Sequence, residues 1–119
     1  MVAWIDGRDR DAAKEKGEQF SGVSLYTAQS FDNGATFRAN RKFQEHTCEC
    51  CRTALTWTTE GPVAIWRNIF GTNTRDFAVS NLDKGGVRRA TDDNWRIDAC
   101  PHNGASVAAD RQGQLHLVW

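Results

Sequence analysis

Cysteine and histidine are the residues of this chain with the most distinctive chemistry. Thiolate and imidazole groups suit zinc and copper, so a cluster of them is a candidate metal site. We interpret residues 48–51 as a C-x-C-C run, which differs from the C-x₂-C spacing of common structural zinc sites. The candidate ligands are Cys48, Cys50, Cys51, Cys100 and His102, with His46 beside the run.

The same four cysteines have two other interpretations. An even number of cysteines fits disulfides in an oxidising compartment, although adjacent Cys50 and Cys51 would pair with each other only under strain. Free or redox-active thiols are the third interpretation. Of the three we favour disulfides, and we keep metal binding and redox chemistry open.

The elements that hold these residues are predicted to be short strands. Apolar residues alternate with polar ones between closely spaced turn signals, which is typical of an all-β fold. The charge-rich segment 10–19 is predicted to be a solvated loop or a short surface helix. The predicted strands span residues 2–5, 22–30, 37–43, 53–58, 63–66, 75–80, 87–96, 106–110 and 115–119.

Residues 30–37 have the pattern S-x-D-x-G-x-T-F, in which each fixed residue suits a tight hairpin turn. Asp and Asn side chains bond to their own backbone in turns, and glycine supplies a positive φ. We expect the serine and threonine to join the strand ends and the phenylalanine to pack under the turn. A weaker copy at residues 80–86 follows 50 residues later, which indicates a repeat with a second turn at 83–85. The residues with expected structural roles are Ser30, Asp32, Gly34, Thr36 and Phe37.

This pattern resembles the Asp-box of the bacterial sialidase-like, or BNR-repeat, β-propeller superfamily. The segments 4–8, 64–68, 74–77 and 113–119 are similar to other phrases of that family. The resemblance implies a six-bladed propeller of four-stranded antiparallel blades, of which this chain holds about two. It is specific for the fold and weak for the activity, because one fold carries many functions.

With the strands of a blade named A to D, the predicted order is B-C-D, then A-B-C-D, then A-B. This gives a blade fragment at 1–45, a full blade at 46–99 and the start of the next blade at 100–119. The B strands end at Trp4, Trp66 and Trp119. We expect the chain to be part of a longer propeller, with self-assembly through open blade edges as the alternative.

In such a propeller the D-to-A and B-to-C loops share one face, where the family carries its site. When the turns at Gly61 and Gly113 are aligned, Cys48 and Cys100 take equivalent places at the entrance to an A strand. The four cysteines are therefore expected to form one cluster on that face.

The resemblance also implies roles for charged residues. A sialidase binds the substrate carboxylate with arginines, and it uses a tyrosine nucleophile with a glutamate partner and an aspartate acid/base. No complete set is present, the usual Arg-Ile-Pro phrase is missing, and we assign the one tyrosine, Tyr26, to packing. The candidates are Arg8, Arg67 and Arg75 for substrate binding and Asp6 and Asp9 for acid/base catalysis.

Composition restricts the partners. The chain has 15 basic and 15 acidic residues, which does not indicate a nucleic-acid surface, and no apolar run is long enough to span a membrane.

The first function hypothesis is an exo-α-sialidase-like glycosidase acting on an acidic sugar or glycan, with no required cofactor and with zinc or copper as an option at the Cys/His cluster. The alternative is a non-catalytic propeller that binds glycan, protein or metal through the same face. The family resemblance suggests export to the periplasm or the extracellular space, although this chain shows no signal peptide.

Overall fold

The computed structural model describes residues 1–99 and 102–119, and it is an all-β protein with one short helix. This confirms the predicted fold class at the level of antiparallel β-structure. The elements are β1 Val2–Asp6, α1 Arg8–Glu15, β2 Val23–Ala28, β3 Arg41–Thr47, β4 Ala54–Thr58, β5 Gly61–Phe70, β6 Thr74–Asn81, β7 Gly85–Arg89, β8 Ser106–Ala109 and β9 Leu115–Val118.

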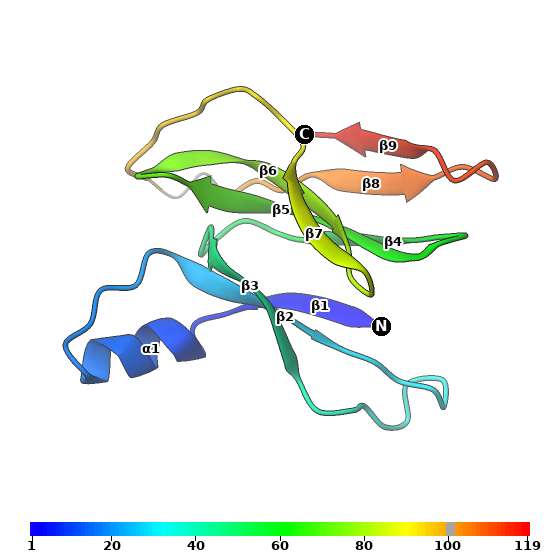
Figure 1. The fold of residues 1–119 in the computed structure, drawn as a ribbon, viewed down its shortest axis with the longest axis horizontal. Helices are drawn as coiled ribbons and strands as arrows, with labels where there is room; N and C mark the ends of the chain where they lie inside the picture. Colours follow the sequence, from blue (N-terminus) through cyan, green and yellow to red (C-terminus); the bar gives the residue numbers. More distant parts are fainter. Residues whose placement is uncertain (100–101) are drawn as a thin grey trace.

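The strands form successive antiparallel meanders (Figure 1). β1, β2 and β3 pair in order, and so do β4, β5, β6 and β7. One pairing, Thr47 with Asn68, joins β3 to β5 and makes a single seven-stranded sheet that does not close. β8 and β9 form a separate hairpin. Four strand bounds differ from the prediction by four residues or more: β3 spans Arg41–Thr47 rather than 37–43, β5 continues to Phe70 rather than 66, and β7 ends at Arg89 rather than 96.

β5 is the centre of the fold because it is buried on both faces. Successive side chains of a strand point to opposite faces, so Ala64 and Trp66 enter one core cluster while Ile65 enters the other. The first cluster also contains Leu25 of β2, and it therefore packs the two meanders together. The Phe43 ring meets Trp66 edge-on, with centroids 6.0 Å apart, in a favoured aromatic geometry.

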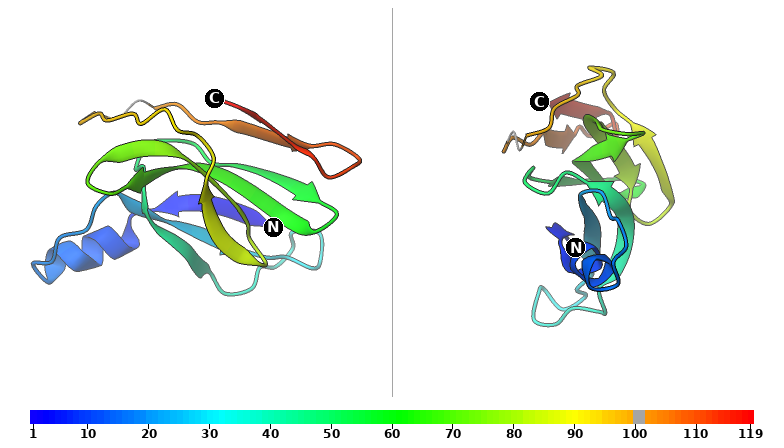
Figure 2. Two further views of the ribbon diagram at one scale, coloured as in Figure 1. Left: turned by 45° about the horizontal axis from the view of Figure 1, so that its top comes forward. Right: turned by 90° about the vertical axis from the view of Figure 1, so that its left-hand side faces the viewer.

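The second cluster holds the β8–β9 hairpin against the sheet. Ile65 and Phe77 form this cluster with Ala105, and Val107 and Leu117 pack against it. β4 lies between the β1–β3 meander and the β8–β9 hairpin, since it contacts both β1 and β8. Figure 2 shows the hairpin over the sheet in two further views.

The turns separate toward two ends of the molecule. The β4–β5 turn, the β8–β9 turn and the loop 29–40 lie at one end, and α1 and the β5–β6 turn lie at the other (Figures 1 and 2). The helix falls within the segment predicted as loop or helix, although it begins earlier, at Arg8.

The β2–β3 loop is ordered by its own side chains. Asp32 accepts hydrogen bonds from the Thr36 backbone N–H at 2.9 Å and the Thr36 hydroxyl at 2.5 Å. The Ser30 hydroxyl donates to Asp32 at 2.7 Å and accepts from the Gly34 N–H at 2.8 Å, with Gly34 at φ +90°. Phe37 differs from its expected role, because it is 48% exposed and does not pack under the turn.

The second predicted turn uses a different residue. In the β6–β7 hairpin, the Asn81 side-chain oxygen accepts from the N–H groups of Asp83 at 2.9 Å and Lys84 at 3.0 Å. The turn lies where the repeat placed it, but Asn81 and not Asp83 supplies the organising side chain. Asp83 instead accepts a hydrogen bond from Gln29 at 3.2 Å, which ties the two turns together.

Candidate functional site

The β3–β4 loop carries the cysteine run, and long-range hydrogen bonds fix where it begins. Thr47 ends β3, and its hydroxyl donates to the Val23 carbonyl at 3.0 Å. The next residue, Cys48, donates its N–H to the Arg67 carbonyl of β5 at 2.9 Å. The run therefore starts where the two meanders meet.

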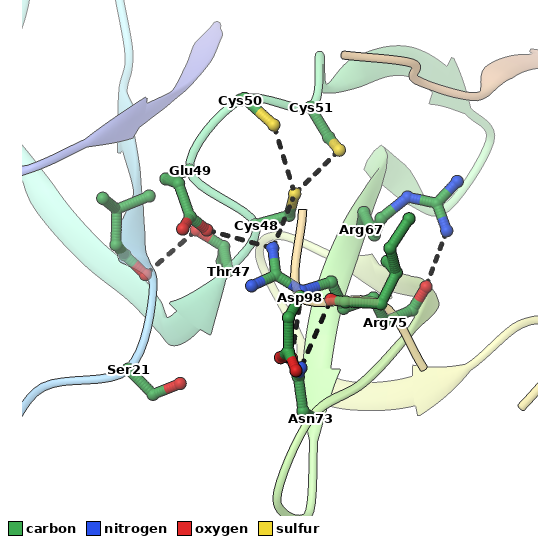
Figure 3. Close-up of polar contacts among 12 residues, drawn as sticks. Ser21, Thr47, Cys48, Glu49, Cys50, Cys51, Arg67, Asn73, Arg75 and Asp98 are labelled. Atoms are coloured by element: carbon green, nitrogen blue, oxygen red, sulfur yellow. Dashed lines mark hydrogen bonds and ion pairs between the residues drawn. The ribbon is translucent and has the colours of Figure 1, made fainter. Parts of the chain in front are cut away.

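Three sulfur atoms gather in this loop (Figure 3). Cys48 Sγ lies 2.8 Å from Cys51 Sγ and 3.8 Å from Cys50 Sγ, and all three lie within 4.8 Å of one another. This spacing allows the group to hold one metal ion. Cys48 and Cys51 are each only 1% exposed. They are also a C-x₂-C pair, a spacing that our C-x-C-C interpretation of the sequence overlooked.

The cysteines are not in one chemical state. Cys48 and Cys51 are free thiols, whereas Cys50 is disulfide-bonded. Cys100, the fourth predicted member, lies outside the described residues. His102 is exposed and is not in the sulfur group that the described residues form. His46 faces another way, with Nδ1 3.0 Å from the Ser21 carbonyl oxygen.

Arg75 of β6 supplies positive charge to the thiol pair. Its Nη1 lies 3.5 Å from Cys48 Sγ and 3.2 Å from a Glu49 carboxylate oxygen. Its Nε donates to Asn73 at 3.0 Å, which holds the guanidinium in this direction. The arginine side chain is 11% exposed, so solvent screens this contact only in part.

The pKa values of the two thiols are shifted in opposite directions. A hydrogen bond donated by the Cys51 thiol lowers the pKa of Cys48 to about 6, against the opposing effect of burial and with help from Arg75. The same hydrogen bond, together with burial, raises the pKa of Cys51. At neutral pH the pair is therefore a thiolate at Cys48 that accepts a hydrogen bond from a thiol at Cys51.

Arg67 supports the site from beneath. It is 3% exposed, and its guanidinium lies over the rings of Phe77 and Trp95, with centroids at 4.1 and 4.7 Å. It donates to the Arg75 carbonyl at 2.6 Å and to Asn103 at 2.9 Å. This buried position differs from the ligand-facing position that we expected, and it suits holding the Arg75 backbone in place.

The sequence interpretation missed Asp76, which orders the segment after β7. This fully buried carboxylate accepts hydrogen bonds from the N–H groups of Asn94 at 3.0 Å and Trp95 at 3.1 Å, and it pairs with Arg89. Burial raises the pKa of Asp76, but these hydrogen bonds and the Arg89 charge outweigh it and keep the pKa below its usual value. In turn the Trp95 carbonyl accepts from the Arg75 N–H at 2.8 Å, which connects Asp76 to the cysteine site.

The remaining predicted residues form a second cluster where β1 meets α1. Arg8 pairs with Asp6 at 2.6 Å, and Trp4 Nε1 donates to the same carboxylate at 2.9 Å. The Tyr26 hydroxyl donates to the two Asp9 oxygens at 3.0 and 3.1 Å, and the Arg8 guanidinium lies 4.4 Å from the Tyr26 ring centre. Tyr26 is buried, as a packing residue would be, but its hydroxyl also takes part in a polar cluster.

The electrostatics of this second cluster favour ionised carboxylates. The hydrogen bond from Arg8 holds the pKa of Asp6 well below its usual range. Burial raises the pKa of Asp9, but the hydrogen bond from Tyr26 and the charges of Lys42 and Arg8 bring it below its usual value. A general acid needs a raised pKa, so the ionised Asp6 and Asp9 are suited to pair with a cation and not to donate a proton.

The structure brings the predicted residues together in two groups. Cys48, Cys50, Cys51, Arg75 and Arg67 lie together, and Asp6, Arg8 and Asp9 lie at α1. Within the part of the chain that the structure describes, no hydrogen bond or ion pair links Arg8 to Arg67 or Arg75. Arg67 and Arg75 belong to the first group and Arg8 to the second.

No helix among the described residues has the length and apolar character needed to cross a membrane. Comparison with protein-family models, with curated proteins and with solved structures gave no match. The chemistry assigned to either cluster therefore rests on the geometry described above.

Proposed function

We propose that this chain is a segment of a sialidase-type β-propeller whose loop face binds a soft metal ion through cysteine thiolates. The propeller assignment is supported by the strand order. β1–β3, β4–β7 and β8–β9 follow the B-C-D, A-B-C-D, A-B order, and β4 neighbours β1 and β8 as an innermost strand would. The side-chain hydrogen bonds of Asp32 fit the role of an Asp-box turn.

Metal binding is carried by one observation, the grouping of three sulfur atoms within 4.8 Å. Thiolates select copper(I) and zinc among the common metals. A metal–sulfur distance of about 2.3 Å puts tetrahedral sulfur ligands roughly 3.7 Å apart. The 3.8 Å between Cys48 and Cys50 fits this spacing, and the 2.8 Å between Cys48 and Cys51 has to widen.

The surroundings suit a thiolate centre. Two or three thiolates bound to one copper(I) leave a net negative charge, and Arg75 lies beside Cys48 to balance it. Cys48 and Cys51 supply two ligands as they stand, and Cys50 supplies a third once its disulfide is reduced. Copper(I) accepts a low number of soft ligands, so it is the metal that we favour.

A competition titration tests this function. The reduced chain and its Cys48→Ser and Cys51→Ser variants are titrated with copper(I) against a chromophoric chelator. Wild type should withdraw one copper per chain from the chelator, and each variant should lose most of this ability. The matched control is Ser30→Ala, which alters a distant turn. Failure of wild type to compete, or equal binding by the serine variants, would refute the proposal.

A second candidate function, binding or hydrolysis of an acidic sugar, is favoured by the Asp9–Tyr26–Arg8 cluster. A tyrosine hydroxyl that donates to a carboxylate, beside an arginine, is the kind of grouping that sialidase chemistry needs. A fluorogenic sialoside assay on the longest natural chain, with Arg8→Ala and Tyr26→Phe, tests it. Turnover that both variants retain in full would exclude this cluster.

The disulfide at Cys50 supports an exported location, since structural disulfides persist in oxidising compartments.

A further inference from the structure

We propose that Cys48 and Cys51 are a redox pair that small hydroperoxides oxidise to a disulfide, and that this disulfide abolishes metal binding. The first half stands on the geometry of the pair alone, and the second half rests on the proposed metal-binding function.

The distance between the two sulfurs carries the inference. Sγ of Cys48 and Sγ of Cys51 are 2.8 Å apart, and a disulfide bond is about 2.05 Å long. Closing that gap takes a shift of less than about 1 Å, so bond formation needs no rearrangement of the fold. The C-x₂-C spacing closes only a small loop, as it does in dithiol redox motifs.

The charges around the pair assign the order of attack. Arg75 Nη1 lies 3.5 Å from Cys48 Sγ, whereas the cation near Cys51 is Arg67, whose two Nη atoms already donate to the Arg75 carbonyl and to Asn103. A cation beside a sulfur favours its thiolate, which is the nucleophilic form. Cys48 is therefore the attacking sulfur, Cys51 is the resolving sulfur, and Arg75 is a positioning residue.

The reaction balances with a hydroperoxide as the oxidant. Cys48 attacks the terminal peroxide oxygen; the O–O bond breaks, and the leaving oxygen takes a proton to become an alcohol or water. The sulfenic acid at Cys48 is then attacked by Cys51, which loses its proton; the S–O bond breaks and water leaves. Two electrons pass from the two thiols to the peroxide.

Burial limits the size of the oxidant that can reach the two sulfur atoms. Each of the two cysteines is only 1% exposed, so a bulky disulfide has little access to either sulfur. Hydrogen peroxide is close to water in size. The pair should therefore react with hydrogen peroxide in preference to a large aromatic disulfide reagent, the reverse of the behaviour of an exposed thiol.

Mass spectrometry after differential alkylation tests the proposal. The full chain is reduced, freed of reductant and treated with one equivalent of hydrogen peroxide, and the peptide 43–52, which contains all three cysteines of the run, is analysed. The Cys50→Ser variant gives the clearest readout, because a bond between Cys48 and Cys51 then lowers the peptide mass by two hydrogens. Cys48→Ser and Cys51→Ser should abolish that change.

Two further variants separate reactivity from folding. Arg75→Gln should slow formation of the bond several-fold, and Arg75→Lys should restore most of the rate, while both keep the circular dichroism of wild type. A bond from either cysteine to any other residue, stable sulfinic acid at Cys48, or faster reaction with the bulky disulfide would each overturn the redox pair.

Copper(I) binding by the oxidised chain tests the second half. Loss of binding after peroxide, with recovery after reduction, is the expected result. If the disulfide forms but reduced protein never binds copper(I), the proposed function fails and the redox pair stands. If copper(I) binds and no disulfide forms, the redox inference fails and the proposed function stands.

Discussion

Arg75 Nη1 lies 3.5 Å from Cys48 Sγ, although 27 residues separate the two in the chain. The arginine comes from the start of β6, and the cysteine is the first residue after β3. The link between them is β5, which pairs with β6 and accepts the Cys48 N–H at Arg67. The fold thus gives a buried thiol a neighbouring cation.

The first prediction concerns the ionisation of Cys48. Its pKa is about 6 against an ordinary value of 9.0, so its thiolate should already be formed at pH 7. Thiolate absorbance near 240 nm (a standard signal) should rise between pH 5 and pH 7 in reduced wild type. Arg75→Gln should move this rise to higher pH, and Cys48→Ser should remove it. A first thiolate that forms only above pH 8 in wild type would contradict the prediction.

The second prediction concerns Asp76. Changing Asp76 to Ala leaves Arg89 without its buried partner and two backbone N–H groups without an acceptor. We expect a loss of about 3 kcal/mol in the free energy of unfolding. Urea unfolding measures it, and the exposed Asp92→Ala is the matched control. Equal stability of the two variants would show that Asp76 does not hold the segment after β7.

The third prediction concerns the Asp32 turn. Asp32→Ala removes the acceptor for Thr36 and should lower the melting temperature, whereas Thr36→Val removes only the hydroxyl bond and should lower it less. Hydrogen bonds from the Thr36 side chain and backbone lower the pKa of Asp32 to about 2, from 3.8. The turn's contribution is therefore complete above pH 3.8 and is lost as pH falls through 2. The gap in melting temperature between wild type and Asp32→Ala should shrink over that range, and a constant gap would contradict it.

Alternation of apolar residues predicted the strands well where one strand neighbours another directly. β8 and β9 follow this pattern closely, since their residues alternate between half-buried and exposed and the two strands pair across one short turn. The predicted strand bounds were wrong where hydrogen bonds outside the sheet hold the backbone. Asp32 accepts a hydrogen bond from the Thr36 N–H and the Gln29 carbonyl accepts one from the Arg38 N–H, so β3 begins only at Arg41. Asp76 accepts hydrogen bonds from the N–H groups of Asn94 and Trp95, which turns this segment away from β7.

The candidate site was predictable in its residues and not in its geometry. The sequence indicated that Cys48, Cys50 and Cys51 act together, because they are nearly adjacent. The closeness of Cys48 to Cys51 depends on a loop that is anchored to β5, and the contact of Tyr26 with Asp9 depends on the path of α1. Both are long-range features that no local pattern reports.

The most direct test of the central claim is the metal content of the reduced chain. Wild type and a Cys48→Ser/Cys51→Ser double variant are incubated with copper(I) under nitrogen, freed of unbound metal and analysed by elemental mass spectrometry. The account predicts one copper per wild-type chain and almost none in the double variant, with both proteins folded. Copper absent from wild type, or present equally in both, would contradict a thiolate metal site at Cys48 and Cys51.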